Sequence, residues 1–251
     1  MISKLEDSQE QIIVLAFGIG VQTVAEMVRN HKSYKYLIFS DTGDEKPETY
    51  DYLITHVLPF VKANNINFVV VKNGKYISLY DYCFVHRQVP MRNFRWCTDK
   101  FKRQPINKFI KSLGATRQNP IIKAMGISAD EIERINGDKS QDKEPKYVKL
   151  SYPLIEANLT REDCKKIIIE AGLPVPVKSG CWYCPFARKE EWRRLKIDRP
   201  AYFDLAVKLE KNNVKYPKRT LKFSKPLELV DFNHSLDDFE EMECDSGHCM
   251  A

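Results

Sequence analysis

The sequence has 251 residues, of which 43% are hydrophobic and 29% are charged, and its formal net charge is +6. This length and composition suit a water-soluble globular chain with one large α/β domain, or one domain and a small appendage. The longest apolar runs, such as Ile12–Phe17 and Phe68–Val71, are far too short to cross a membrane. The polar start MISKLEDSQEQ is not typical of a secretory signal or transit peptide. We therefore expect a cytoplasmic protein with no membrane partner, whose 7 cysteines are thiols or metal ligands rather than disulfides.

The N-terminal part of the chain predicts strands that alternate with helices. Buried strands are expected at Gln11–Phe17, Tyr36–Ser40 and Ile66–Val71, and helices at Gln22–His31 and Pro47–Ala63. This order is typical of a doubly wound, mostly parallel sheet between two layers of helices. In such sheets ligands bind beyond the carboxyl ends of the strands, so the turns after the first two strands are candidate sites.

The remaining elements are less regular, because the pattern is broken from Gly74 onward. We predict, in order, a helix at Asp99–Leu113, a strand at Ile121–Ala124, a loop at Asn136–Tyr147 and helices at Thr160–Gly172, Ala187–Lys196 and Pro200–Asn212. The chain is accordingly divided into a nucleotide-binding α/β domain at residues 1–150 and a helical, cysteine-bearing extension at residues 151–251 that packs on it.

Two turns carry the features of a ligand site. In the first (AFGIGVQT), Gly18 and Gly20 let the backbone turn tightly before a helix N-terminus, an arrangement that suits a phosphate or sulfate group. The second holds Asp41, Asp44 and Glu45, whose carboxylates can bond a ribose or an adenine amino group, or help to hold Mg²⁺. The alternatives are an ordinary strand-to-helix turn for the first and helix N-capping for the second.

The cysteines indicate a metal site. Cys181 and Cys184 form a C-x-x-C motif followed by proline, so that one turn supplies two thiolates, and Cys97 begins a basic helix that favours the thiolate form. Cys244 and Cys249, with a histidine between them, are the other candidate ligands. The residues leave open an iron–sulfur cluster, a structural zinc, a thioredoxin-like dithiol and buried thiols. Cys83 and Cys164 are expected in the core.

Charge in the C-terminal part is unevenly distributed. Residues 178–225 hold 14 Lys and Arg against 5 Asp and Glu, whereas residues 226–251 hold 8 acids and no Lys or Arg. Clustered cations gain affinity for polyanions by displacing counterions from phosphates. Lys178–Lys225 is therefore a candidate surface for RNA, tRNA or another anionic substrate, the alternative being solvated helix faces.

Five segments, in this order, resemble the phosphoadenosine phosphosulfate (PAPS) reductase family of the adenine-nucleotide α-hydrolase (PP-loop) superfamily. They are AFGIGVQT, FSDTGDEKPETY, RWCTDKFKRQPI, GISADEIERI and YPLIEANLTREDC with KSGCWYCPF, and they span roughly residues 11–188. The resemblance implies a three-layer α/β fold and a site for ATP or for a sulfonucleotide (PAPS or adenylylsulfate). The implied nucleotide-binding residues are Ala16, Phe17, Gly18, Gly20, Gln22, Thr23, Asp41, Thr42, Gly126 and Glu131.

The resemblance also implies a [4Fe–4S] cluster on Cys97, Cys181 and Cys184, with zinc as the alternative. The chain departs from the family at two places. A single cysteine stands at Cys97 where adenylylsulfate reductases have two, which leaves one iron open unless a tail cysteine binds it. The tail ECDSGHC is longer by two residues than the family's E-C-G-x-H.

These features lead to three alternative functions. The first is ATP-dependent sulfur transfer, in which a nucleic-acid or small-molecule acceptor is adenylated and a sulfur nucleophile displaces AMP. The second is sulfonucleotide reduction with a thiol or thioredoxin-type reductant. Cys244 and Cys249 are the expected catalytic thiols in both. The third is a non-catalytic, zinc-stapled module that binds nucleotides or nucleic acid.

Overall fold

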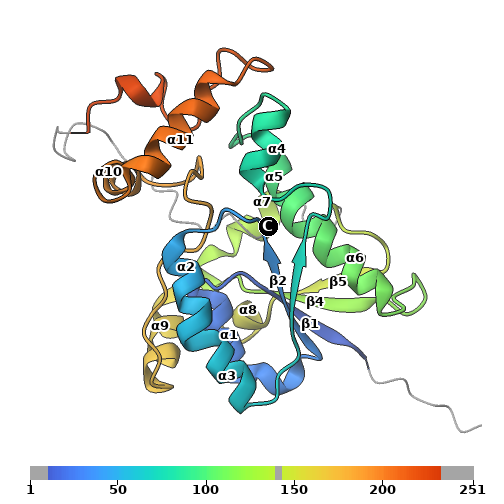
Figure 1. Cartoon of the computed structure of the whole chain (residues 1–251). Coiled ribbons are helices and arrows are strands. Elements are labelled where there is room, and N and C mark those ends of the chain that lie inside the picture. The colour runs from blue at the N-terminus through green and yellow to red at the C-terminus, as the bar shows by residue number, and fades with distance from the viewer. Residues whose placement is uncertain (1–10, 139–142, 233–251) are drawn as a thin grey trace, which may run out of the picture.

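The structure is a computed structural model that describes residues 11–138 and 143–232 (Figure 1). Five strands form one parallel sheet in the order β3-β2-β1-β4-β5. They are β1 (Ile13–Phe17), β2 (Tyr36–Asp41), β3 (Phe68–Lys72), β4 (Ile121–Met125) and β5 (Val148–Ser151). The α/β class and the parallel sheet are therefore as predicted.

Helices connect the strands and extend the chain after β5. The α-helices are α1 (Val21–Asn30), α2 (Pro47–Tyr52), α3 (Leu58–Ala63), α4 (Leu79–Val85), α5 (Trp96–Thr98), α6 (Gln104–Ser112), α7 (Glu133–Asp138), α8 (Pro153–Glu156), α9 (Arg161–Glu170), α10 (Lys189–Asp198) and α11 (Pro200–Lys211). Short 3₁₀ turns are η1 (His31–Ser33), η4 (Ala129–Glu131) and η6 (Leu227–Leu229), and π-helical turns are η2 (Leu53–Val57) and η3 (Asp99–Arg103). Among the described residues no helix is both long enough and apolar enough to span a membrane.

Each face of the sheet is covered because successive strand residues point to opposite sides. Leu15 and Phe17 of β1 pack in one core with α1, α2, α3, α8 and α9. Val14 and Ala16 pack in another core with α6. The result is a three-layer arrangement in which the two cores share the sheet between them (Figure 1).

A third core lies beyond the carboxyl ends of the strands, where Figure 1 shows α4, α10 and α11. It contains Cys83, Tyr183 and Trp192, each at most 1% exposed. The predicted helices near Ala187–Lys196 and Pro200–Asn212 are α10 and α11. The boundary proposed after residue 150 falls inside β5.

The sequence did not predict several short elements, among them α7, α8, α4 and β5. The last two are the most informative. The stretch after Gly74 contains α4, which begins after Ser78, a residue whose Oγ accepts a hydrogen bond from the Asp81 N–H and so caps the helix. A fifth strand, β5, pairs with β4 in a region where no strand was expected. Both elements are seven residues or shorter, which is too short to show a clear hydrophobic period.

Candidate nucleotide-binding site

The sheet has a topological switch point between β1 and β4. From β1 the chain proceeds through β2 to β3 on one side of the sheet, and the later strands β4 and β5 lie on the other side. Ala16 pairs with Met125 at the carboxyl ends of the two central strands. Because crossover connections diverge there, a crevice forms at this edge, and it is where open α/β sheets bind ligands.

The first turn leads directly from β1 into the N-terminus of α1. The Thr23 Oγ1 accepts a hydrogen bond from the Gly20 N–H at 3.2 Å and donates one to the Gly20 carbonyl at 3.1 Å, which fixes the start of the helix. Ile19 is buried and has a φ of 57°, a left-handed conformation that is strained for a β-branched residue. The surrounding core therefore holds this turn in one conformation.

A pocket opens between this turn and the carboxyl end of β4. Its lining combines five residues singled out from the sequence with cations from three other segments: Gly18, Gly20, Val21, Gln22, Thr23, Gly126, Arg134, Arg161, Lys178 and Ser179. The cavity is small, about 40 Å³, which suits a group of the size of a phosphate. No Asp or Glu is among the lining residues, so the pocket combines a positive helix end with cationic side chains.

The cations of this pocket are held in place by neighbours. Arg134 pairs with Glu131 at 2.9 Å, and Arg161 donates a hydrogen bond to the Gln22 Oε1 at 3.3 Å. The Lys178 Nζ is buried without a hydrogen-bond partner among the described residues, and its nearest ion-pair carboxylate, Glu191, is 3.9 Å away. A buried ammonium is costly without a partner, so the Lys178 Nζ is suited to an anionic ligand.

A second cavity of about 380 Å³ lies at the same edge, on the α6 side of β1 and β4. It is lined by Ala16, Phe94, Arg95, Trp96, Thr98, Asp99, Lys102, Arg103, Ile106, Lys123, Met125, Lys143, Glu144 and Leu150. Burial lowers the pKa of Lys123, although Glu144 at 2.8 Å acts in the opposite direction. A buried lysine with a perturbed pKa that lines a cavity is a candidate functional residue. The ion pair with Glu144 also fits a purely structural role for Lys123.

The second turn is tied to the C-x-x-C segment. The Trp182 N–H donates to the Asp44 carbonyl at 3.1 Å and the Lys46 N–H donates to the Gly180 carbonyl at 3.0 Å, so the two segments pair antiparallel. The Thr42 Oγ1 lies 3.5 Å from the Cys181 Sγ. The cysteine motif therefore adjoins the carboxyl end of β2.

The helix that carries Cys97 reaches the same place. Glu45 is 2% exposed, and its Oε1 lies 3.1 Å from the Lys102 Nζ. The Glu45 Oε2 is buried without a hydrogen-bond partner among the described residues. Asp41, in contrast, is engaged within the fold by Lys72 and Tyr50. The structure thus brings together the second turn, the Cys97 segment and the C-x-x-C motif.

The cysteines of this region share one core. Cys181 is buried, and Cys97 and Cys184 are partly buried against the same apolar cluster. Burial, followed by the charge of Glu45, raises the pKa of the Cys181 thiol, which favours the protonated form. Cys83 and Cys164 are fully buried, as predicted for core residues. Cys244 and Cys249 lie outside the described residues.

Within residues 11–138 and 143–232, no group of three or more His, Cys, Asp or Glu side chains is arranged to hold a metal ion. Cys97, Cys181 and Cys184 therefore share a region but do not form a ready ligand set. The iron–sulfur cluster stays a prediction from the sequence.

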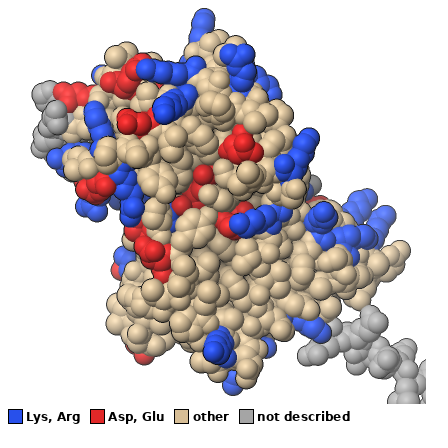
Figure 2. All heavy atoms as spheres, viewed as in Figure 1, with Lys and Arg blue, Asp and Glu red and all other residues tan. Residues whose placement is uncertain are grey.

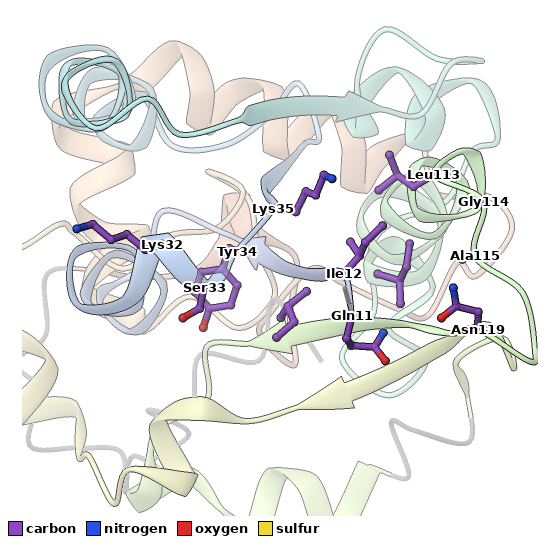
Figure 3. Close-up of a pocket in the computed structure, with 12 residues that line it drawn as sticks. Gln11, Ile12, Lys32, Ser33, Tyr34, Lys35, Leu113, Gly114, Ala115 and Asn119 are labelled. Atoms are coloured by element: carbon purple, nitrogen blue, oxygen red, sulfur yellow. The ribbon is translucent and has the colours of Figure 1, made fainter. Parts of the chain in front are cut away.

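The largest of the described cavities, about 530 Å³, lies at the opposite edge of the sheet (Figure 3). It adjoins the amino ends of β1 and β4 and is lined in part by Ile12, Lys32, Lys35 and Leu113. Parallel sheets bind ligands at the carboxyl edge, where the strained turn, the helix N-terminus and the clustered cations lie. We therefore place the functional site at the carboxyl edge despite the smaller cavities there.

Several residues of the candidate site were not predicted from the sequence, namely Arg134, Arg161, Ser179, Lys102 and Lys123. Lys123 could have been found from the sequence, because a lysine inside the buried strand IIKAM is unusual unless it is paired or functional. Arg134, Arg161 and Lys178 come from three segments that only the fold brings together. Nothing in the local sequence indicates that these three cations meet.

No family model matches the sequence, and a search of the curated proteins found no match. Among solved structures, the chain is similar to a phosphoadenylyl-sulfate (PAPS) reductase from Candida auris, determined as a phosphate complex. The match has a TM-score of 0.43 and 20% sequence identity and covers 66% of this chain and 74% of that chain. At this level of similarity the function has to be argued from the site itself.

Proposed function

We propose that the chain is an adenine-nucleotide-dependent enzyme that binds the nucleotide's phosphates at the N-terminus of α1. The observation that carries the proposal is the pocket at the sheet's switch point, where the α1 N-terminus, Arg161 and Lys178 face one small space without a carboxylate in its lining. This combination of charge and position suits phosphate groups. The resemblance of five sequence segments to the PAPS reductase family supports adenine as the base.

For the reaction we propose ATP-dependent sulfur transfer. ATP would adenylate an oxygen of the acceptor with release of pyrophosphate, and a sulfur nucleophile would then displace AMP. Arg134, Arg161 and Lys178 would stabilise the charge of the departing pyrophosphate. The cavity of about 380 Å³ beside Cys97 is large enough for the acceptor group. Among the described cysteines, Cys97 and Cys184 are partly buried, whereas Cys181 is buried.

Binding and product release test the proposal together. Calorimetric titration of ATP into the full chain gives the dissociation constant, and a coupled assay gives pyrophosphate release in the presence of single-stranded RNA. Arg161→Ala and Lys178→Ala are each expected to weaken ATP binding by a factor of about 10 to 150, because each removes a charge-assisted contact worth about 1.5–3 kcal/mol.

Lys166→Ala is the matched control, since this lysine lies on the exposed surface of α9 with its side chain 71% exposed. It is expected to leave ATP binding unchanged. Equal affinity of the wild type, Arg161→Ala and Lys178→Ala for ATP would show that the phosphates bind elsewhere.

Sulfonucleotide reduction is the second candidate, and one observation favours it. ATP usually binds together with Mg²⁺, yet the lining of the α1 pocket contains no carboxylate to hold the ion. A phosphosulfate needs no metal to bind a cationic pocket. Titration of PAPS and ATP with and without Mg²⁺ separates the two: tighter binding of PAPS without the metal, with sulfite release on adding a thiol, would favour reduction.

A further inference from the structure

A basic groove lies outside the nucleotide pocket, between the loop at residues 91–94 and the segment at residues 218–224. Its volume is about 280 Å³, and its lining contains four cations, two aromatic rings and no Asp or Glu: Met91, Arg92, Asn93, Phe94, Lys218, Arg219, Thr220, Leu221, Lys222, Phe223 and Ser224. Figure 2 shows Lys and Arg side chains, with some acids among them, over the upper part of the molecule, where Figure 1 shows α4, α10 and α11. In the part of the chain that is described, none of the four cations forms an ion pair.

Phe94 connects this groove to the sheet edge. Its side chain is 67% exposed and lines both the groove and the 380 Å³ cavity that contains Ala16 and Lys123. An exposed aromatic side chain where two cavities meet can stack on a planar group of a ligand. A ligand in the groove can therefore reach the cavity by passing Phe94.

The charge of Lys222 is affected by neighbouring cations. Lys222 is half-buried, and burial together with the charges of Arg92 and Lys178 lowers its pKa, while Cys184 and Glu191 act in the opposite direction. An anionic ligand would relieve the repulsion among the three cations.

We propose that the groove binds single-stranded nucleic acid, whose phosphates contact the four cations and one base of which stacks on Phe94 at the mouth of the cavity. This inference rests on the proposed function, for which it supplies the acceptor. A single strand fits better than a duplex, because the bases of a duplex stack on each other and offer no face to Phe94. It fits better than a membrane, because the groove presents charge and a single exposed ring rather than an apolar helix face.

The test is fluorescence anisotropy with a labelled single-stranded oligouridylate of about 12 nucleotides, a length within the usual site sizes. Affinity of the full chain is measured across a range of salt concentrations. Each phosphate contact of a single strand contributes about −0.7 to the slope of the logarithm of the association constant against the logarithm of the salt concentration. Four contacts are therefore expected to give a slope of about −2.8. The double variant Lys218→Ala with Arg219→Ala is expected to make this slope shallower by about 1.4.

Phe94→Ala tests stacking separately from charge. It is expected to weaken binding by a factor of about 5 to 150 with an unchanged salt slope, whereas Phe94→Trp is expected to retain affinity. The control Lys165→Ala with Lys166→Ala removes the same charge from α9 and is expected to change neither quantity. Circular dichroism checks that each variant is folded.

Two outcomes would overturn the inference: an affinity for the oligonucleotide that the groove variants leave unchanged, or binding to anionic vesicles with none to the oligonucleotide. ATP titration of the same variants separates this proposal from the proposed function. If the groove variants lose RNA binding and keep ATP binding, both proposals stand. If wild type binds RNA through the groove but no nucleotide, the groove stands and the proposed function fails.

Discussion

At the scale of single residues, Asp41 shows how the carboxyl end of β2 is fixed. The Asp41 Oδ1 accepts hydrogen bonds from the Gly43 N–H at 2.8 Å and the Tyr50 hydroxyl at 2.6 Å, and its Oδ2 lies 2.8 Å from the Lys72 Nζ. Burial alone would raise the pKa of Asp41, but the hydrogen bonds of Lys72, Tyr50 and Gly43 outweigh it and hold the pKa below its usual value. The ionised form therefore stabilises the fold.

The sign of the pH dependence follows from this shift. A carboxyl whose pKa is lower in the folded state contributes stability that is present above its unfolded pKa of about 3.9 and lost as the pH falls through the folded value. Asp41→Asn is expected to lower the free energy of unfolding by about 1–3 kcal/mol at pH 7, and the difference from wild type is expected to shrink below about pH 4. Urea denaturation of both proteins over a series of pH values measures this difference in the free energy of unfolding. Asp204→Asn, on exposed surface of α11, is the control; equal effects of both variants would refute this account.

At the scale of elements, α1 and β4 meet closely at Gly126. A Cβ built at this glycine would lie 2.5 Å from the Thr23 Cγ2 and 3.1 Å from the Thr23 backbone nitrogen. Gly126→Ala is therefore expected to push the N-terminus of α1 away from β4, lowering the melting temperature and weakening nucleotide binding by at least about tenfold.

A second substitution checks the cause. Thr23→Ser removes the Cγ2 and keeps the hydroxyl that bonds Gly20. The double variant Gly126→Ala with Thr23→Ser is expected to recover part of the lost melting temperature and affinity, because the tightest contact is gone. If the double variant is no better than Gly126→Ala alone, the contact with Thr23 is not the reason for the loss.

The same elements show what a sequence pattern can predict. β1, α1 and β2 were predicted within two residues, because buried apolar runs and a 3.6-residue period are local properties. The helix predicted at Thr160–Gly172 is α9, and Thr160 and Asp163 form the capping box at its start. The strand β5 was not predicted, because a strand of four residues depends on its pairing with β4 rather than on its own sequence.

At the scale of the whole molecule, the site depends on contacts between distant segments. The glycine turn was predicted as a phosphate site from local sequence, and the structure adds Arg134, Arg161 and Lys178 to the same pocket. Thr42 and Cys181, 139 positions apart, meet at 3.5 Å. Local periodicity carries no information on such pairs, so the assembly of the two turns, the basic helix and the C-x-x-C motif had to come from the fold.

The position of the nucleotide is tested most directly by hydrogen–deuterium exchange of the full chain with and without ATP. Slower exchange is expected at Gly18–Thr23, at Gly126 and at Lys178–Ser179, because a bound phosphate would engage and order the α1 N-terminus and its neighbours. The backbone amides that line the amino-edge cavity, at Lys32–Lys35 and Leu113–Ala115, are expected to exchange at the same rate with and without ATP. Protection confined to that amino edge, with none at Gly18–Thr23, would contradict binding of the phosphates at the α1 N-terminus.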